Sequence, residues 1–62
     1  MLANIVMRLP AWYAALEEVR GHRSLAMGEP AAGHFAAAAE GFRAAGQPLD
    51  EARCAALAGA SN

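Results

Sequence analysis

Three side chains in this sequence, His22, His34 and Cys54, are of the types that bind metals or act as nucleophiles. Structural zinc sites use close pairs, such as cysteines about two to four residues apart or histidines about three to five apart. The three residues lie far apart and form no such pair. Cys54 falls within an alanine-rich predicted helix rather than at a strained turn. We therefore predict no metal site, no cofactor and no catalytic residue, with Cys54 a small buried thiol and both histidines partly exposed on helix surfaces.

Two adjacent carboxylates, Glu17 and Glu18, are the remaining candidates for chemistry. Neighbouring residues point about 100° apart on a helix, whereas catalysis by paired carboxylates needs both groups to converge on one substrate. The pattern favours a solvated acidic face that pairs with Arg20 and Arg23. The glycines are spread over predicted helix ends and a helix interior, so they form no phosphate-binding loop. No enzymatic activity is predicted.

Two aromatic residues, Trp12 and Tyr13, are the strongest candidates for recognition, because aromatic side chains are enriched at binding hot spots. On an amphipathic helix such residues more often belong to the core, and both alternatives stay open. The residues that we predict to contact a partner are Leu2, Ile5, Val6, Leu9, Trp12, Tyr13 and Leu57.

Length and composition indicate one small domain that associates with something else. The chain has 62 residues, and much of its hydrophobic fraction of 56% is alanine. Burying a large apolar side chain contributes about 1.5–3 kcal/mol, whereas ordering the backbone costs about 1–2 kcal/mol per residue. These terms nearly cancel for so few large residues. We therefore expect a protein partner: neighbouring helical repeats, a partner helix or a second copy in a homo-oligomer.

Charge and hydropathy exclude two other classes of partner. Five arginines are scattered among six acidic residues, giving a net charge of −1, whereas nucleic-acid modules present a basic face. No uncharged apolar run approaches the length of about 20 residues that spans a membrane. The lone Cys54 fits a reducing, cytoplasmic location. We predict no binding to nucleic acid and no membrane association.

Apolar residues recur at helical spacing throughout, and proline–glycine breaks divide the chain. The spacing predicts a short amphipathic helix over 1–9, helices over 11–27, 30–45 and 49–58, and a tail over 59–62. The breaks at 28–30 and 46–48 combine a helix-ending glycine with a proline that opens the next helix. Short links make successive helices antiparallel. The predicted fold is all-α, an antiparallel helical hairpin plus a third helix.

The hydrophobic pattern also predicts which residues face each other. On the second helix it predicts an apolar stripe of Ala31, Phe35, Ala38 or Ala39, Phe42 and Ala45. The predicted core consists of Trp12, Leu16, Phe35, Phe42 and Leu57. Two faces are expected to stay uncovered, one formed by Leu2, Ile5, Val6 and Leu9 and the other by Ala52, Ala56 and Leu57.

The stretch over 10–58 resembles tetratricopeptide-like helical repeats. Ala31, Phe35 and Ala38 have the alanine–aromatic–alanine spacing of that repeat's second helix, and Tyr13-x-x-Leu16 is similar to the opening of its first helix. The whole stretch from Gly28 to Leu57 resembles degenerate repeats in large bacterial LuxR-type ATP-dependent transcriptional regulators and related signalling ATPases and cyclases. It departs from the pattern at Glu17, where the family has glycine, and in the short link at 28–30.

The resemblance implies a bacterial, non-catalytic interaction or scaffold segment of a larger regulator in signal transduction or transcription. About three repeats are needed for independent stability, so it also implies a fragment. The alternative is a small self-associating helical bundle with no relation to such repeats.

Overall fold

A computed structural model describes residues 11–61, which form three α-helices and no strand. The helices are α2 (Ala11–Ala26), α3 (Ala32–Ala44) and α4 (Pro48–Ala60). Over these residues the all-α prediction is confirmed, and each predicted helix boundary in this range lies within two residues of the observed one. The helix predicted over 1–9 lies outside the described residues.

The ends of α2 and α3 follow the glycines that the sequence pattern singled out. Gly28 and Gly46 adopt left-handed backbone conformations, with φ of 71° and 74°. After α2, the backbone N–H of Glu29 donates to the carbonyl oxygen of Ser24 at 2.8 Å, and an equivalent bond closes α3 at 2.9 Å. These are Schellman motifs, which satisfy carbonyl groups left free at a helix end. Pro48 then opens α4 in its first turn, where its missing N–H costs no hydrogen bond.

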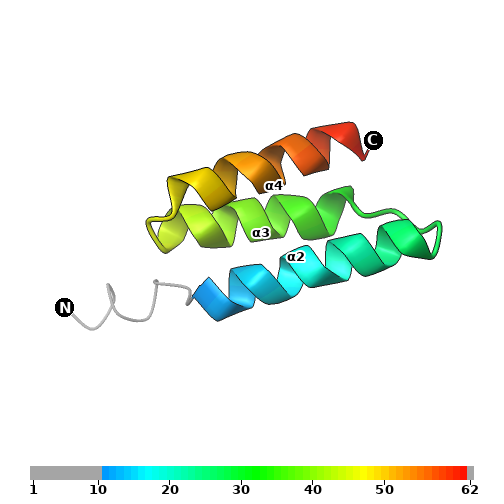
Figure 1. The fold of residues 1–62 in the computed structure, drawn as a ribbon, viewed down its shortest axis with the longest axis horizontal. Helices are drawn as coiled ribbons and strands as arrows, with labels where there is room; N and C mark the ends of the chain where they lie inside the picture. Colours follow the sequence, from blue (N-terminus) through cyan, green and yellow to red (C-terminus); the bar gives the residue numbers. More distant parts are fainter. Residues whose placement is uncertain (1–10, 62) are drawn as a thin grey trace.

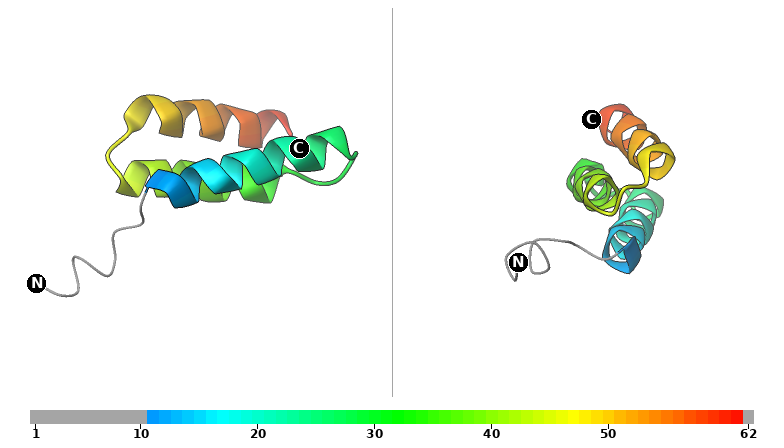
Figure 2. Two further views of the ribbon diagram at one scale, coloured as in Figure 1. Left: turned by 60° about the horizontal axis from the view of Figure 1, so that its bottom comes forward. Right: turned by 90° about the vertical axis from the view of Figure 1, so that its left-hand side faces the viewer.

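Successive helices run in opposite directions, as the short links require (Figure 1). Viewed along the helices, α3 forms the corner between α2 and α4 and packs against both (Figure 2). The predicted antiparallel hairpin with a third helix therefore describes the arrangement over 11–61. Most of the packing joins helices that are neighbours in the sequence.

The core follows the predicted apolar stripe of α3. Phe35 is fully buried and Phe42 nearly so, with Ala31 and Ala38 on the same stripe. Phe42 and Ala38 cluster with Ala14 of α2 and with Cys54 of α4. The predictions that both phenylalanines are core residues and that Cys54 is a buried thiol are confirmed.

The predicted inner face of α2 is wrong. Trp12 is 67% exposed and Leu16 is 38% exposed, so neither belongs to the core, and Leu57 of α4 is only half-buried. The inner face of α2 instead carries small and polar residues, which are Ala14, Glu17, Gly21 and Ser24.

The physical reason is that side chains and backbone of α3 already fill the space between α2 and α3. A Cβ atom on Gly21 would lie 2.7 Å from Cε1 of Phe35, and one on Gly41 would lie 2.8 Å from the Cβ of Ala14. The ring of Phe35 therefore occupies the space beside Gly21, and the backbone of α3 at Gly41 lies directly against Ala14. A large residue on this face of α2 would push the helices apart.

Candidate functional site

A buried carboxylate joins α2 to α3. Glu17 is only 6% exposed, and its Oε1 accepts a hydrogen bond from Nδ1 of His34 at 2.9 Å. Its Oε2 accepts a second bond from Nη1 of Arg20 at 3.0 Å. An ionised carboxylate only accepts, so Nδ1 of His34 is the donor in this bond. The bond with His34 is the main reason that the pKa of Glu17 lies below 4.5; burial opposes it and the charge of Arg20 assists it.

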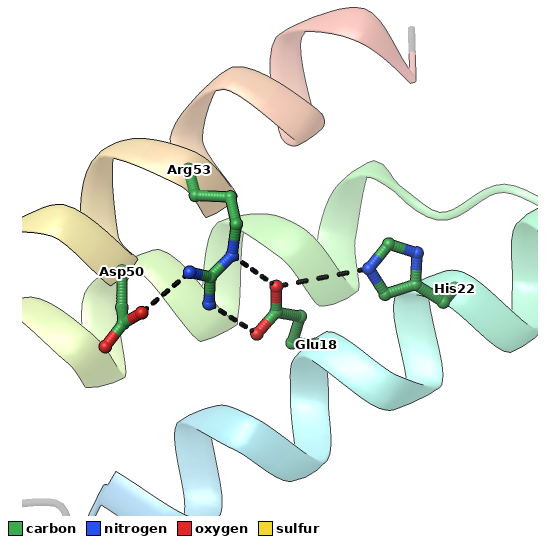
Figure 3. A network of polar contacts seen from close by, with 4 residues as sticks. All are labelled: Glu18, His22, Asp50 and Arg53. Atoms are coloured by element: carbon green, nitrogen blue, oxygen red, sulfur yellow. Dashed lines mark hydrogen bonds and ion pairs between the residues drawn. The ribbon is translucent and has the colours of Figure 1, made fainter.

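A second carboxylate joins α2 to α4 (Figure 3). Arg53 holds Glu18 with two parallel bonds, from Nε to Oε2 at 2.7 Å and from Nη2 to Oε1 at 2.8 Å. Its remaining nitrogen, Nη1, donates to Asp50 at 2.7 Å. Nε2 of His22 lies 4.0 Å from the same Glu18 carboxylate. The bonds from Arg53 lower the pKa of Glu18 below its usual 4.5.

The prediction of a solvated acidic face at Glu17 and Glu18 is therefore wrong. The 100° between the two positions directs one carboxylate to α3 and the other to α4, so both are used in joining helices. The sequence signal that could have found this is the set of oppositely charged or hydrogen-bonding residues on the later helices, His34 and Arg53. Of the predicted pairs with Arg20 and Arg23, the pair of Glu17 with Arg20 is present.

The side chains left to consider are the Cys54 thiol and the imidazoles of His22 and His34. Burial raises the pKa of the Cys54 thiol, and the nearby Glu18 carboxylate raises it further, which is opposite to the activation of a nucleophilic cysteine. Over residues 11–61, no three histidine, cysteine or acidic side chains gather closely enough to hold a metal ion. His22 is exposed and meets the ring of Phe35 edge-on at 5.1 Å, whereas His34 is half-buried against Glu17.

A shallow depression of about 200 Å³ lies between the end of α2 and the start of α3. Its lining mixes basic, acidic and apolar side chains, which are Arg20, Arg23, Ser24, Met27, Glu29 and His34. Arg20 and His34 are already bonded to Glu17. The depression therefore offers no convergent set of free groups around one ligand.

The most distinctive surface is the outer face of α2, which we define as Trp12, Leu16, Val19 and Arg23. Trp12 and Val19 are 67% and 63% exposed, and Leu16 lies between them in the helix. All four positions lie on the side of the helix opposite to Ala14 and Gly21, as the 100° step per residue requires. The helix thus buries Ala14, Gly21 and Ser24 beside Glu17, whereas its large apolar residues Trp12 and Val19 face solvent.

Of the predicted partner-contacting residues within the described range, Trp12 lies on this outer face. Tyr13 is half-buried and meets the Trp12 ring edge-on at 6.3 Å. Leu57 is half-buried on α4, where Ala52 and Ala56 of the predicted uncovered face are exposed. Leu2, Ile5, Val6 and Leu9 lie outside the described residues. Val19 was not among the predicted interaction residues, although it follows Trp12 and Leu16 at helical spacing.

Residues 11–61 thus define a small helical unit with charged links between helices and one apolar outer face. Among the helices described here, none combines the length and apolar character needed to cross a bilayer. No protein-family model, curated protein or solved structure matches the chain.

Proposed function

We propose that this chain is a non-catalytic protein-interaction or scaffold segment that works by burying the outer face of α2 against another helix. The observation that carries the proposal is the exposure of Trp12 and Val19 on either side of Leu16. Exposed apolar residues are ordinary when scattered singly, but a contiguous set on one helix face is typical of a binding surface. Tryptophan is also among the residues most enriched at binding hot spots.

The resemblance to tetratricopeptide-like repeats supports the same proposal. Ala31, at the N-cap of α3, is buried together with Phe35 and Ala38 of that helix, and α2 and α3 form an antiparallel pair (Figure 1). In a repeat array the first helix of each pair has a neighbouring repeat to pack against. The outer face of α2 would then be the docking surface of a scaffold in a signalling or transcriptional regulator.

The test compares Val19→Glu with the matched control Leu49→Glu. Leu49 is a large apolar residue, 85% exposed, at the start of α4 and away from the outer face. We expect the unaltered chain to self-associate or to bind a dye for apolar surfaces. Val19→Glu should reduce both properties, and Leu49→Glu should change neither. A folded, dye-negative monomer at high concentration that is insensitive to Val19→Glu would contradict the proposal.

A further inference from the structure

We infer that the occupant of the outer face of α2 is a second copy of this chain, packed antiparallel across a two-fold axis. This inference rests on the proposed function, because it names the partner of the same surface. It is carried by the position of the single charge on that surface, Arg23, relative to Trp12; the order of the spacings permits the two-fold contact.

The spacings are symmetric. Trp12, Leu16, Val19 and Arg23 follow one another at steps of four, three and four residues. Residues at alternating steps of three and four form one stripe along a helix, and such stripes are the seam along which two helices pack in a coiled coil. Read from either end, the order of these steps is the same. A two-fold axis through the middle of the seam therefore places Leu16 of one copy against Val19 of the other, and Trp12 of one copy against Arg23 of the other.

The charge selects the antiparallel arrangement. Arg23 is exposed, and within residues 11–61 it takes part in none of the ion pairs, whereas Arg20 is bound to Glu17. In the antiparallel arrangement each guanidinium lies over an indole ring of the other copy, which is a favourable cation–π contact, formed twice. A parallel arrangement would bring the two Arg23 side chains together, and like charges at a contact destabilise it.

An isologous contact of this kind closes after two copies. The two-fold axis pairs the outer face of α2 with itself, so each copy that joins the contact uses up the face through which it could bind another. We therefore expect a discrete dimer of the 6.4 kDa chain rather than open aggregation. The contact involves one helix from each copy, which places it among small, reversible interfaces.

The experiment is sedimentation of the full chain over a range of concentrations, together with the fluorescence of Trp12. The chain has one tryptophan, so its emission reports the outer face directly. We expect a monomer–dimer equilibrium, with the emission shifting to the blue as the dimer forms. Val19→Glu should abolish both changes while Leu49→Glu leaves both intact. Circular dichroism verifies that each variant keeps its helix content.

Arg23→Ala, compared with Arg43→Ala on the exposed side of α3, tests the orientation. Loss of two cation–π contacts in an antiparallel dimer should weaken association by about 5- to 30-fold. In a parallel dimer the same change removes a repulsion and should strengthen association. Arg43→Ala should change association little.

The outcomes separate the two proposals. A stronger dimer for Arg23→Ala overturns the antiparallel arrangement. A monomer that binds the dye, and loses this binding with Val19→Glu, overturns the inference of a second copy. It still supports the proposal that the outer face binds a helix of another protein. An assembly larger than two copies also overturns the inference. A dye-negative monomer overturns both the inference and the proposed function.

Discussion

Gly21 sets the distance between α2 and α3, because it has no side chain. Phe35 fills the position that a methyl group on Gly21 would occupy, whereas no atom lies within 4 Å of the corresponding position at Gly33. Glycine in a helix costs about 1 kcal/mol relative to alanine. At Gly21 the missing side chain allows the two helices to pack closely, whereas at Gly33 the glycine makes no close contact possible that alanine would prevent.

Gly21→Ala and Gly33→Ala should therefore change stability in opposite directions. For Gly21→Ala we expect a loss of about 1–3 kcal/mol in the free energy of unfolding, because an overpacked ring must move. For Gly33→Ala we expect a gain of up to about 1 kcal/mol from helix propensity. Urea denaturation monitored by circular dichroism measures both changes. Equal effects at the two positions would mean that the ring of Phe35 does not lie against Gly21.

The pKa shifts of Glu17 and Glu18 predict how stability depends on pH. Both folded-state pKa values lie below 4.5, mainly because of the hydrogen bonds with His34 and Arg53. A lowered pKa stabilises the folded state above the unfolded-state value, and this contribution is lost as the pH falls through the folded-state value. We expect the free energy of unfolding to decrease on acidification below about pH 4.5. Thermal unfolding between pH 7 and pH 3 measures this, and Glu17→Gln should flatten the dependence.

At the scale of the helices, the sequence predicts the ends and the α3 stripe but not the orientation of α2. Gly28 and Gly46 act locally, through their own backbone angles, so their effect is visible in the sequence. Phe35 and Phe42 are the largest apolar residues of α3, and the helix contains no other large apolar residue that could occupy its inner face instead. On α2, ranking by hydrophobicity selects Trp12 for the core, and only the rings on α3 explain why small residues face inward instead.

The same difficulty applies to the candidate site. Trp12 could be identified from its residue type, but its exposure depends on which face of α2 packs on α3. The sequence predicts a solvated Glu17 because helical spacing pairs it only with arginines of its own helix, whereas its partner in the fold, His34, is 17 residues further along the chain. Pairings between helices depend on the three-dimensional packing, which residue spacing within one helix does not determine.

Phe35→Ala should test whether α3 holds the three helices together. Phe35 is fully buried, and truncating a buried phenylalanine costs about 3–5 kcal/mol. Small domains have a total stability of about 0.05–0.15 kcal/mol per residue, so this loss should unfold much of the population. The control is Leu49→Ala, whose side chain is 85% exposed and whose loss should cost less than about 0.5 kcal/mol. A melting temperature unchanged by Phe35→Ala would contradict the packing described here.

For the whole molecule, association and folding should be linked. A partner that binds only the folded state raises the apparent stability by mass action. If a second copy covers the outer face of α2, the melting temperature should rise with protein concentration. Scanning calorimetry at several concentrations measures this, and Val19→Glu should remove the dependence. A melting temperature independent of concentration would argue against a dimer.

The order of the helices has a kinetic consequence. Most of the packing joins α3 to its two neighbours in the chain, and helical proteins dominated by such local contacts fold in about microseconds to milliseconds. The bonds between Glu18 and Arg53 span 35 residues, so we expect them to form after the transition state of folding. Arg53→Lys, which loses the two parallel bonds, should then accelerate unfolding and leave the refolding rate nearly unchanged. Temperature-jump relaxation would measure both rates, and slower refolding would place this link inside the transition state.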